Sequence, residues 1–327
     1  MIFPWQSDQW QQLFRSKQEG RLAHALLLTG MAGTGKAQFA DSFSRALLCQ
    51  HPNVKEAVFY CNTCHACRLL AGRTHPNVLW IEPEKEDQAI KIDQVREISE
   101  FIYHSGLDGE YRVVVINPAN NMNTSAANAL LKTLEEPPTG AILILVSDLS
   151  KRLPATILSR CQRVIFPQPQ KELALSWLKT QITDRALDPA LLLNLANGAP
   201  LAALGFMQNK VFAVRENLFQ ALYSFNKNAE NPVKLAAKLP HDDLILLLDF
   251  TLSWLTDLLR LQLGDDHHRL TNKDYEKQLL ELKNSTLIKN NTKMLEYLCQ
   301  LRGQICSGIN LNKQLALESI FIKWMKA

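Results

Sequence analysis

The sequence predicts an α/β domain built on a parallel sheet, followed by an all-helical region. Short, unbroken apolar runs alternate with amphipathic helical patterns through the first 166 residues. Beyond residue 169 the apolar positions follow helical spacing, without further β-branched runs. Strands buried on both faces of a parallel sheet have continuous apolar runs, and their alternation with helices is typical of a doubly wound sheet.

Four apolar runs are expected to form strands, at residues 25–28, 78–81, 113–116 and 142–146. Three helices between them should each bury one stripe: Phe39, Ala40, Phe43, Ala46 and Leu47 in the first, Ile92, Val95, Ile98 and Ile102 in the second, and Leu130, Leu131 and Leu134 in the third. Pro137 and Pro138 should stop the third helix, because proline cannot continue the backbone hydrogen bonding. The α/β domain is expected to end near Val164.

The Pro-Gln-Pro stretch at 167–169 predicts a linker. We expect a domain at 1–166, a small helical domain at 167–207 with a turn at Gly198 and Pro200, and a larger helical domain at 208–327. The longest apolar stretch, residues 244–263, is interrupted by Asp249, Asp257 and Arg260. Those charges predict a buried or amphipathic helix and argue against a membrane span.

Composition excludes several classes of protein. Of the 327 residues, 46% are hydrophobic and 21% charged, which is ordinary for a globular chain and argues against disorder. The formal charge of +4 is too small to argue for a dedicated DNA-binding domain. The N-terminus lacks the basic segment and apolar run of a secretory signal. We expect a cytoplasmic protein without a membrane segment, in which the seven cysteines are metal ligands or reduced thiols.

Residues 30–37, GMAGTGKA, match a phosphate-binding loop between the first strand and the first helix. In such a loop, Gly30, Gly33, Thr34 and Gly35 let backbone N–H groups surround phosphate oxygens at a helix N-terminus. Lys36 would reach the outer phosphates. The alternative is a glycine turn beside an ordinary surface lysine.

The residues that handle Mg²⁺ in such loops are missing. Ala37 replaces the hydroxyl residue that ligates the ion. The run at 113–116 continues into Asn117 and Pro118, where an active nucleotidase needs carboxylates. We therefore expect no intrinsic ATPase activity, while the intact phosphate loop leaves nucleotide binding open.

Four cysteines are spaced as metal ligands. Cys61, Cys64 and Cys67 are separated by two residues each, and Cys49 lies shortly before them. Four thiolates close a tetrahedral Zn²⁺ site and leave no position for water, so the predicted zinc is structural. The alternatives are a cluster of reduced cysteines, or substitution of one ligand by His51 or His65. Cys161, Cys299 and Cys306 lack this spacing.

Several motifs together resemble one family. They are Pro4-Trp5, AHALLLTG at 23–30, the inserted cysteines, THPN at 74–77, IDQVREI at 92–98, NALLKTLEEPP at 128–138, TILSRC at 156–161 and GINLNKQLALES at 308–319. LLKTLEEPP followed by SRC about twenty residues later is the most specific. Across nearly its whole length the chain resembles the delta-prime subunits of bacterial DNA polymerase III clamp loaders.

The resemblance implies an AAA+ module with an inserted zinc module at 49–67, a helical lid, and a C-terminal collar that assembles a five-subunit ring. The ring partners would be the gamma or tau ATPase subunits and the delta subunit. The assembled ring would load a sliding clamp onto primed DNA during replication. Arg160 would be an arginine finger, acting in trans on the neighbouring subunit's ATP. The alternative for Arg160 is a surface arginine at the domain edge.

In the active ATPase subunits of this family an arginine follows a glycine in the lid. In this chain Gly198 is followed by Ala199 and Pro200, which lead to Leu201 instead of an arginine. This difference agrees with a subunit that does not hydrolyse ATP. Two other functions compete with this hypothesis: an independent P-loop ATPase, such as the motor subunit of a clamp loader, and a zinc-dependent nucleic-acid-binding module. Glu135 and Glu136 are expected to form an exposed or subunit-facing edge and not a catalytic pair.

Overall fold

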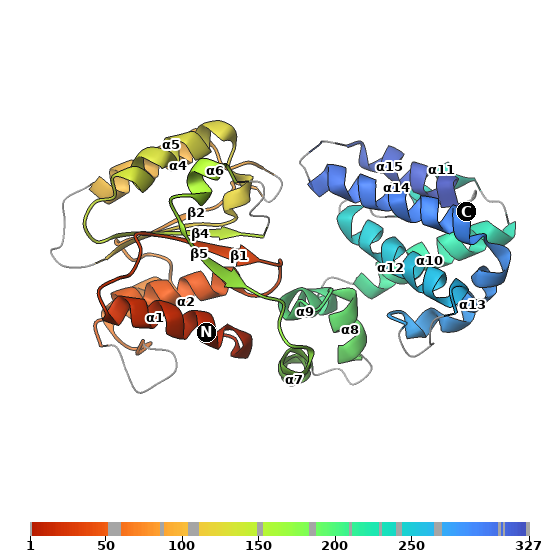
Figure 1. Cartoon of the computed structure of the whole chain (residues 1–327), viewed down its shortest axis with the longest axis horizontal. Coiled ribbons are helices and arrows are strands. Elements are labelled where there is room, and N and C mark those ends of the chain that lie inside the picture. The colour runs from red at the N-terminus through yellow and green to blue at the C-terminus, as the bar shows by residue number, and fades with distance from the viewer. Residues whose placement is uncertain are drawn as a thin grey trace. The chain divides into compact units, whose positions relative to one another are not determined.

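The computed structural model describes residues 2–51, 60–85, 88–103, 111–148, 153–182, 188–208, 211–228, 231–239, 244–264, 270–306, 309 and 311–324. The chain divides into two compact units (Figure 1). The N-terminal unit comprises Met1–Trp177 and Ala199–Ala202, and the C-terminal unit comprises Leu178–Gly198 and Ala203–Ala327.

The N-terminal unit contains a five-stranded parallel sheet with the strand order β2-β3-β4-β1-β5. The strands are β1 (Ala25–Gly30), β2 (Val78–Ile81), β3 (Arg112–Ile116), β4 (Ala141–Ser147) and β5 (Gln162–Phe166). The four predicted strands are therefore confirmed. The fifth lies at the sheet edge, and its residues alternate in burial, so it lacks the continuous apolar run that marks the others.

Helices cover both faces of the sheet, as Figure 1 shows. The short 3-10 turn η1 (Pro4–Gln6), α1 (Ser7–Gln18), α2 (Lys36–Leu48) and α3 (His65–Ala71) lie on one side, while α4 (Ile92–Tyr103), α5 (Thr124–Glu135) and α6 (Ala155–Leu158) lie on the other. A second 3-10 turn, η2 (Ala119–Asn121), precedes α5. Each face has its own core, because successive residues of a strand point to opposite sides: Leu26 and Leu28 pack with α1 and α2, and Leu27 packs with α4 and α5.

Local sequence signals fix the ends of α5. The Asn123 side chain accepts a hydrogen bond from the Ala126 N–H at 2.8 Å, which caps the helix N-terminus. The helix ends at Glu135, two residues before Pro137, as predicted. Leu130 and Leu134 are buried and Leu131 is half-buried against the same core. The end of α5 is thereby held beside α6, and Arg160 lies two residues after the end of α6.

Three short helices follow the sheet: α7 (Lys171–Gln181), α8 (Pro189–Leu195) and α9 (Pro200–Gln208). The start of α9, Ala199–Ala202, belongs to the N-terminal unit. Among the described residues no single helix is long and apolar enough to cross a membrane; one bent pair, α8 with α9, meets the criteria of length and composition when the two are combined.

The rest of the C-terminal unit contains α10 (Val211–Asn228), α11 (Pro232–Ala237), α12 (Leu244–Gln262), η5 (Lys273–Tyr275), α13 (Glu276–Ser285), α14 (Ile288–Cys306) and α15 (Lys313–Trp324). The apolar stretch at 244–263 forms α12, a core helix as predicted, with Trp254 and Leu258 almost completely buried. All three of its charges are paired: Asp249 pairs with Arg302 of α14, and Asp257 pairs with Arg260 one turn later in the same helix.

Candidate functional site

The predicted phosphate loop lies between β1 and α2, as its sequence context requires. Gly35 caps α2 in the left-handed region at φ 87°, and Gly33 also has a positive φ of 74°. Both need to be glycine for space as well, because a Cβ on Gly33 would lie 2.8 Å from the Ala202 Cβ and one on Gly35 would lie 2.5 Å from the Phe3 ring. The loop is thus packed between the N-terminal segment and the start of α9.

Lys36 does not extend into solvent. Its side chain is 2% exposed, and Nζ donates to the carbonyl oxygens of Gly30 and Met31 at 3.0 and 2.6 Å. Nζ also lies 2.5 Å from Oδ1 of Asp148, a half-exposed carboxylate. The lysine predicted to reach phosphates is therefore occupied by groups of its own chain.

Sequence reasoning missed Asp148, although strand register places it. Thr29 of β1 pairs with Ser147, the last residue of β4, so Asp148, which follows the strand, lies near the start of the loop at Gly30. An acidic residue two positions after an unbroken apolar run was the available signal, since the carboxyl ends of parallel strands meet at one edge of the sheet. The register between β1 and β4 was needed to read it.

The loop carbonyls accept hydrogen bonds from other parts of the unit. The Trp5 indole N–H and the Gln6 side-chain amide each donate to the Thr34 carbonyl oxygen at 2.9 Å. Gln6 also donates to the Gly35 carbonyl at 2.9 Å, and the Leu201 N–H donates to the Gly33 carbonyl at 3.0 Å. The structure brings the predicted loop residues together in a closed conformation held by its own chain.

The positions at which an active nucleotidase holds Mg²⁺ carry no hydroxyl or carboxylate side chain in this chain. Ala37 is the second residue of α2, and Asn117 directly follows β3, with its N–H bonded to the Ile81 carbonyl oxygen at 2.9 Å. Neither side chain supplies the hydroxyl or carboxylate that the ion prefers. Asp148 does provide a carboxylate at the loop, but it is engaged with Lys36.

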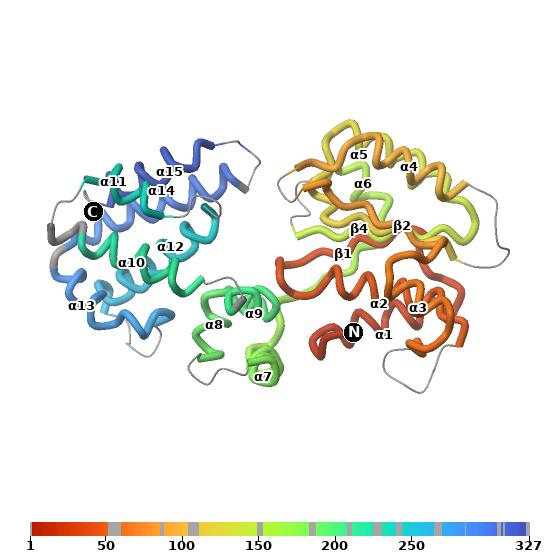
Figure 2. The backbone as a smooth tube through the Cα atoms, turned by 180° about the vertical axis from the view of Figure 1, so that it is seen from behind, coloured from red at the N-terminus to blue at the C-terminus, as the bar shows by residue number. Residues whose placement is uncertain are grey.

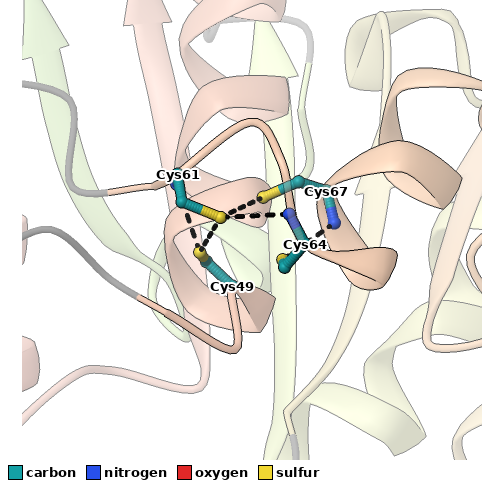
Figure 3. A group of neighbouring side chains, drawn as sticks. All are labelled: Cys49, Cys61, Cys64 and Cys67. Atoms are coloured by element: carbon teal, nitrogen blue, oxygen red, sulfur yellow. Dashed lines mark hydrogen bonds between the residues drawn. The ribbon is translucent and has the colours of Figure 1, made fainter.

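The four predicted zinc ligands converge. The sulfur atoms of Cys49, Cys61, Cys64 and Cys67 all lie within 4.8 Å of one another (Figure 3). Cys49 and Cys61 sulfurs are 3.6 Å apart, and those of Cys61 and Cys67 are 3.9 Å apart. Four sulfurs bound to Zn²⁺ at ~2.3 Å in a tetrahedron lie ~3.8 Å from one another. The donor set and its spacing therefore fit a zinc ion.

Two helix ends and the backbone shape this cluster. Cys49 follows α2, and Cys64 caps α3, which begins beside α2 (Figure 2). The N–H groups of Cys61, Cys64 and Cys67 donate to the sulfurs of Cys49, Cys61 and Cys64 at 3.3, 3.2 and 3.4 Å. Such donors stabilise thiolates, the form that binds metal.

The thiols of the cluster differ in acidity. Hydrogen bonds from the Thr63 side chain, then from the Thr63 and Cys64 backbone, lower the pKa of Cys61 to about 5. Burial raises the pKa of Cys49 and, more strongly, that of Cys67. Within the described part of the chain, the group of convergent ligands comprises the four cysteines without His51 or His65.

Arg160 lies just after α6, on the face of the sheet opposite the zinc cluster. Its Nη2 is 2.5 Å from Oε1 of Glu135 at the end of α5, and its Nη1 donates to the Thr156 carbonyl oxygen at 3.0 Å. The Arg160 side chain is 35% exposed and that of Glu135 50% exposed. Next to it Cys161 is buried, and burial raises its pKa to about 11. The Arg160 guanidinium is therefore partly exposed to solvent and is held in place by Glu135 and the Thr156 carbonyl of its own chain.

Comparison with known proteins identifies the family. Residues 5–170 match the family described as DNA polymerase III, delta subunit, and residues 210–326 match its C-terminal family. The chain is 36% identical over 326 residues to DNA polymerase III subunit delta' of Pseudomonas aeruginosa, covering 99% of this chain and 97% of that protein. The chain belongs to the delta-prime family of DNA polymerase III subunits.

Membership in the delta-prime family extends across both units. The delta' subunit of Escherichia coli is 32% identical over 321 residues, covering 98% of this chain and 94% of that protein. Among solved structures, a DNA polymerase III gamma subunit-related protein from Thermotoga maritima aligns with a TM-score of 0.49 at 20% identity, over 96% of this chain and 99% of that one. The resemblance inferred from the sequence motifs is confirmed.

Proposed function

We propose that this delta-prime chain is a non-hydrolysing subunit of the DNA polymerase III clamp loader that supplies Arg160 to the ATP site of a neighbouring subunit. The observation that carries the proposal is an anchored, half-exposed guanidinium within Ser159-Arg160-Cys161, on a chain whose own phosphate loop is closed. A fixed guanidinium offsets the charge that develops on a transferred phosphoryl group, an effect worth ~10³–10⁵ in the rate of GTPases.

In this proposal the chain occupies a five-subunit ring with gamma or tau ATPase subunits and the delta subunit in the cytoplasm. The ring opens a sliding clamp and loads it onto primed DNA. The C-terminal helical region, 208–327, provides the collar contacts, and residues 167–207 form the lid of the AAA+ module. The full-length similarity to delta' subunits supports this assignment.

The chain's own phosphate loop contributes no hydrolysis in this proposal. Ala37, Asn117 and Pro118 lack the groups that hold Mg²⁺, and Lys36 is neutralised by Asp148. Nucleotide binding would require Asp148 to release the lysine. Intrinsic, Mg²⁺-dependent ATP turnover by the purified chain would instead favour the independent ATPase.

A structural zinc ion would be held by Cys49, Cys61, Cys64 and Cys67. Four thiolates fill its coordination sphere, so the ion would fix α3 against α2 and supply no reactive water. The proposed role is to stabilise the inserted module, with no part in ATP hydrolysis.

The test is the clamp- and DNA-stimulated ATPase rate of a reconstituted loader that carries Arg160→Ala. The neighbouring site should lose most of its turnover while the complex still assembles. Arg163→Ala is the matched control, because Arg163 is an exposed arginine on β5 only three residues away. Unchanged turnover in a fully assembled Arg160→Ala complex would reduce the proposed role to scaffolding.

A further inference from the structure

The contact between Arg160 and Glu135 joins two separate elements. Glu135 is the last residue of α5, whose position is set by the buried Leu130 and Leu134, and Arg160 follows the short helix α6. The carboxylate contacts Nη2 at 2.5 Å, while Nη1 is held by the Thr156 carbonyl at 3.0 Å and lies 3.4 Å from the Ser159 hydroxyl. Both ends of the guanidinium are thus fixed by groups of the same chain.

This arrangement leaves the guanidinium able to bind a further anion. An arginine side chain carries five N–H donors in a rigid plane. The contacts with Glu135, Thr156 and Ser159 engage the two terminal nitrogens and leave donors for a ligand approaching from solvent. The partial exposure of the side chain provides that approach.

The pair contributes little to folding. Ion pairs between partly exposed side chains contribute little to stability because water and salt screen them. The position of the Arg160 guanidinium matters more than the stability that the pair contributes. A displacement of about 1 Å in a group that acts on a reacting centre costs about 10²-fold in rate. A long, flexible arginine benefits from a fixed anchor before it enters a neighbouring site.

We propose that Glu135 is a positioning residue that holds the Arg160 guanidinium in the orientation in which it acts on the neighbouring subunit's nucleotide. This inference rests on the proposed function of Arg160. Glu135 touches no nucleotide itself and acts only through Arg160. Its effect must therefore vanish when Arg160 is absent.

The experiment measures kcat and KM for ATP in the reconstituted loader with clamp and primed DNA. The variants are Glu135→Ala, Glu135→Gln, Arg160→Ala and the double variant Glu135→Ala with Arg160→Ala. We expect Glu135→Ala to lower kcat at the neighbouring site by about tenfold to about a hundredfold with little change in KM. Glu135→Gln, which keeps a hydrogen-bond acceptor, should recover part of that loss.

Glu136→Ala is the matched control. Glu136 is the neighbouring exposed carboxylate, and Tyr103 contacts its backbone carbonyl, which the substitution keeps. This variant should turn over ATP at the normal rate. The thermal unfolding midpoint of each variant chain checks that the fold is intact, and gel filtration checks that the loader assembles.

The double variant decides the interpretation. If Glu135 acts through Arg160, the double variant matches Arg160→Ala alone. Normal or raised turnover in Glu135→Ala, with turnover lost in Arg160→Ala, overturns the positioning role and leaves the proposed function intact. A further loss in the double variant also overturns it, because Glu135 would then act independently. Normal turnover in Arg160→Ala overturns the proposed function and this inference together.

Discussion

At the scale of single residues, the contact between Lys36 and Asp148 governs what the phosphate loop can bind. A buried ammonium group requires a partner, and Lys36 has a carboxylate and two carbonyl oxygens around it. A phosphate group would need the same ammonium. A nucleotide would therefore have to compete with Asp148 for Lys36, and the retained lysine does not by itself make the loop a nucleotide site.

Removing the charge of Asp148 should shift that competition. We expect Asp148→Asn to raise the affinity of the purified chain for a fluorescent ATP analogue by about tenfold, because a charge-assisted hydrogen bond contributes about 1.5–3 kcal/mol and Asp148 is partly exposed. The same variant should lower the free energy of unfolding by about 1–3 kcal/mol, since Lys36 loses its counter-charge. Fluorescence titration and urea unfolding measure the two effects.

Asp93→Asn is the control for this substitution. Asp93 is an exposed aspartate that pairs with Arg96 on α4, away from the loop. It should change neither nucleotide affinity nor stability measurably. Equal affinity of Asp148→Asn and the unaltered chain would mean that Trp5, Gln6 and the start of α9, and not Asp148, keep nucleotide out.

At the scale of elements, the four cysteines tie the end of α2 to the start of α3. Cys64 caps α3 with its sulfur, and Cys64, Cys67 and Leu70 belong to the same core as α2. Seven residues are too few for a helix to be stable alone in water. We infer that α3 depends on this core and on the ion proposed at the cluster.

Cys64→Ser should therefore remove zinc and loosen α3. Metal analysis of the purified chain should give about one zinc per chain for the unaltered protein and for Cys299→Ser, whose exposed cysteine lies outside the cluster. It should give much less for Cys64→Ser. Amide hydrogen exchange should rise across α3, while Arg160-dependent ATPase in an assembled loader persists. Lost ATPase with unchanged exchange in α3 would contradict a structural ion.

The sequence predicted elements whose signals are local. The unbroken runs of β1, β3 and β4 and the two-residue spacing of Cys61, Cys64 and Cys67 needed no knowledge of distant residues. To predict the partners of Lys36 and Arg160, in contrast, the positions of distant residues had to be known. Asp148 lies 112 positions after Lys36, and Glu135 lies 25 positions before Arg160. Such contacts depend on strand register and on packing between helices, which residue spacing alone does not specify.

At the scale of the whole molecule, the two units have separate cores. Among the residues that the structure describes, the cores on the two faces of the sheet contain none from α10 to α15, whereas the C-terminal core contains Trp254, Leu258 and their neighbours. The C-terminal unit also buries a charged network. Asp257 is fully buried and accepts hydrogen bonds from the N–H groups of Thr271 and Asn272 at 3.1 and 2.7 Å.

Separate cores predict separate unfolding of the intact chain in scanning calorimetry. Asp257→Ala leaves the buried N–H groups of Thr271 and Asn272 without this acceptor, which costs about 1–3 kcal/mol for each, so the C-terminal transition should fall by about 4–24 °C. A zinc chelator should lower only the N-terminal transition, by ~2–4 °C for each kcal/mol of metal stabilisation lost. If either treatment moves both transitions together, the two units do not unfold independently, and the prediction of separate unfolding is wrong.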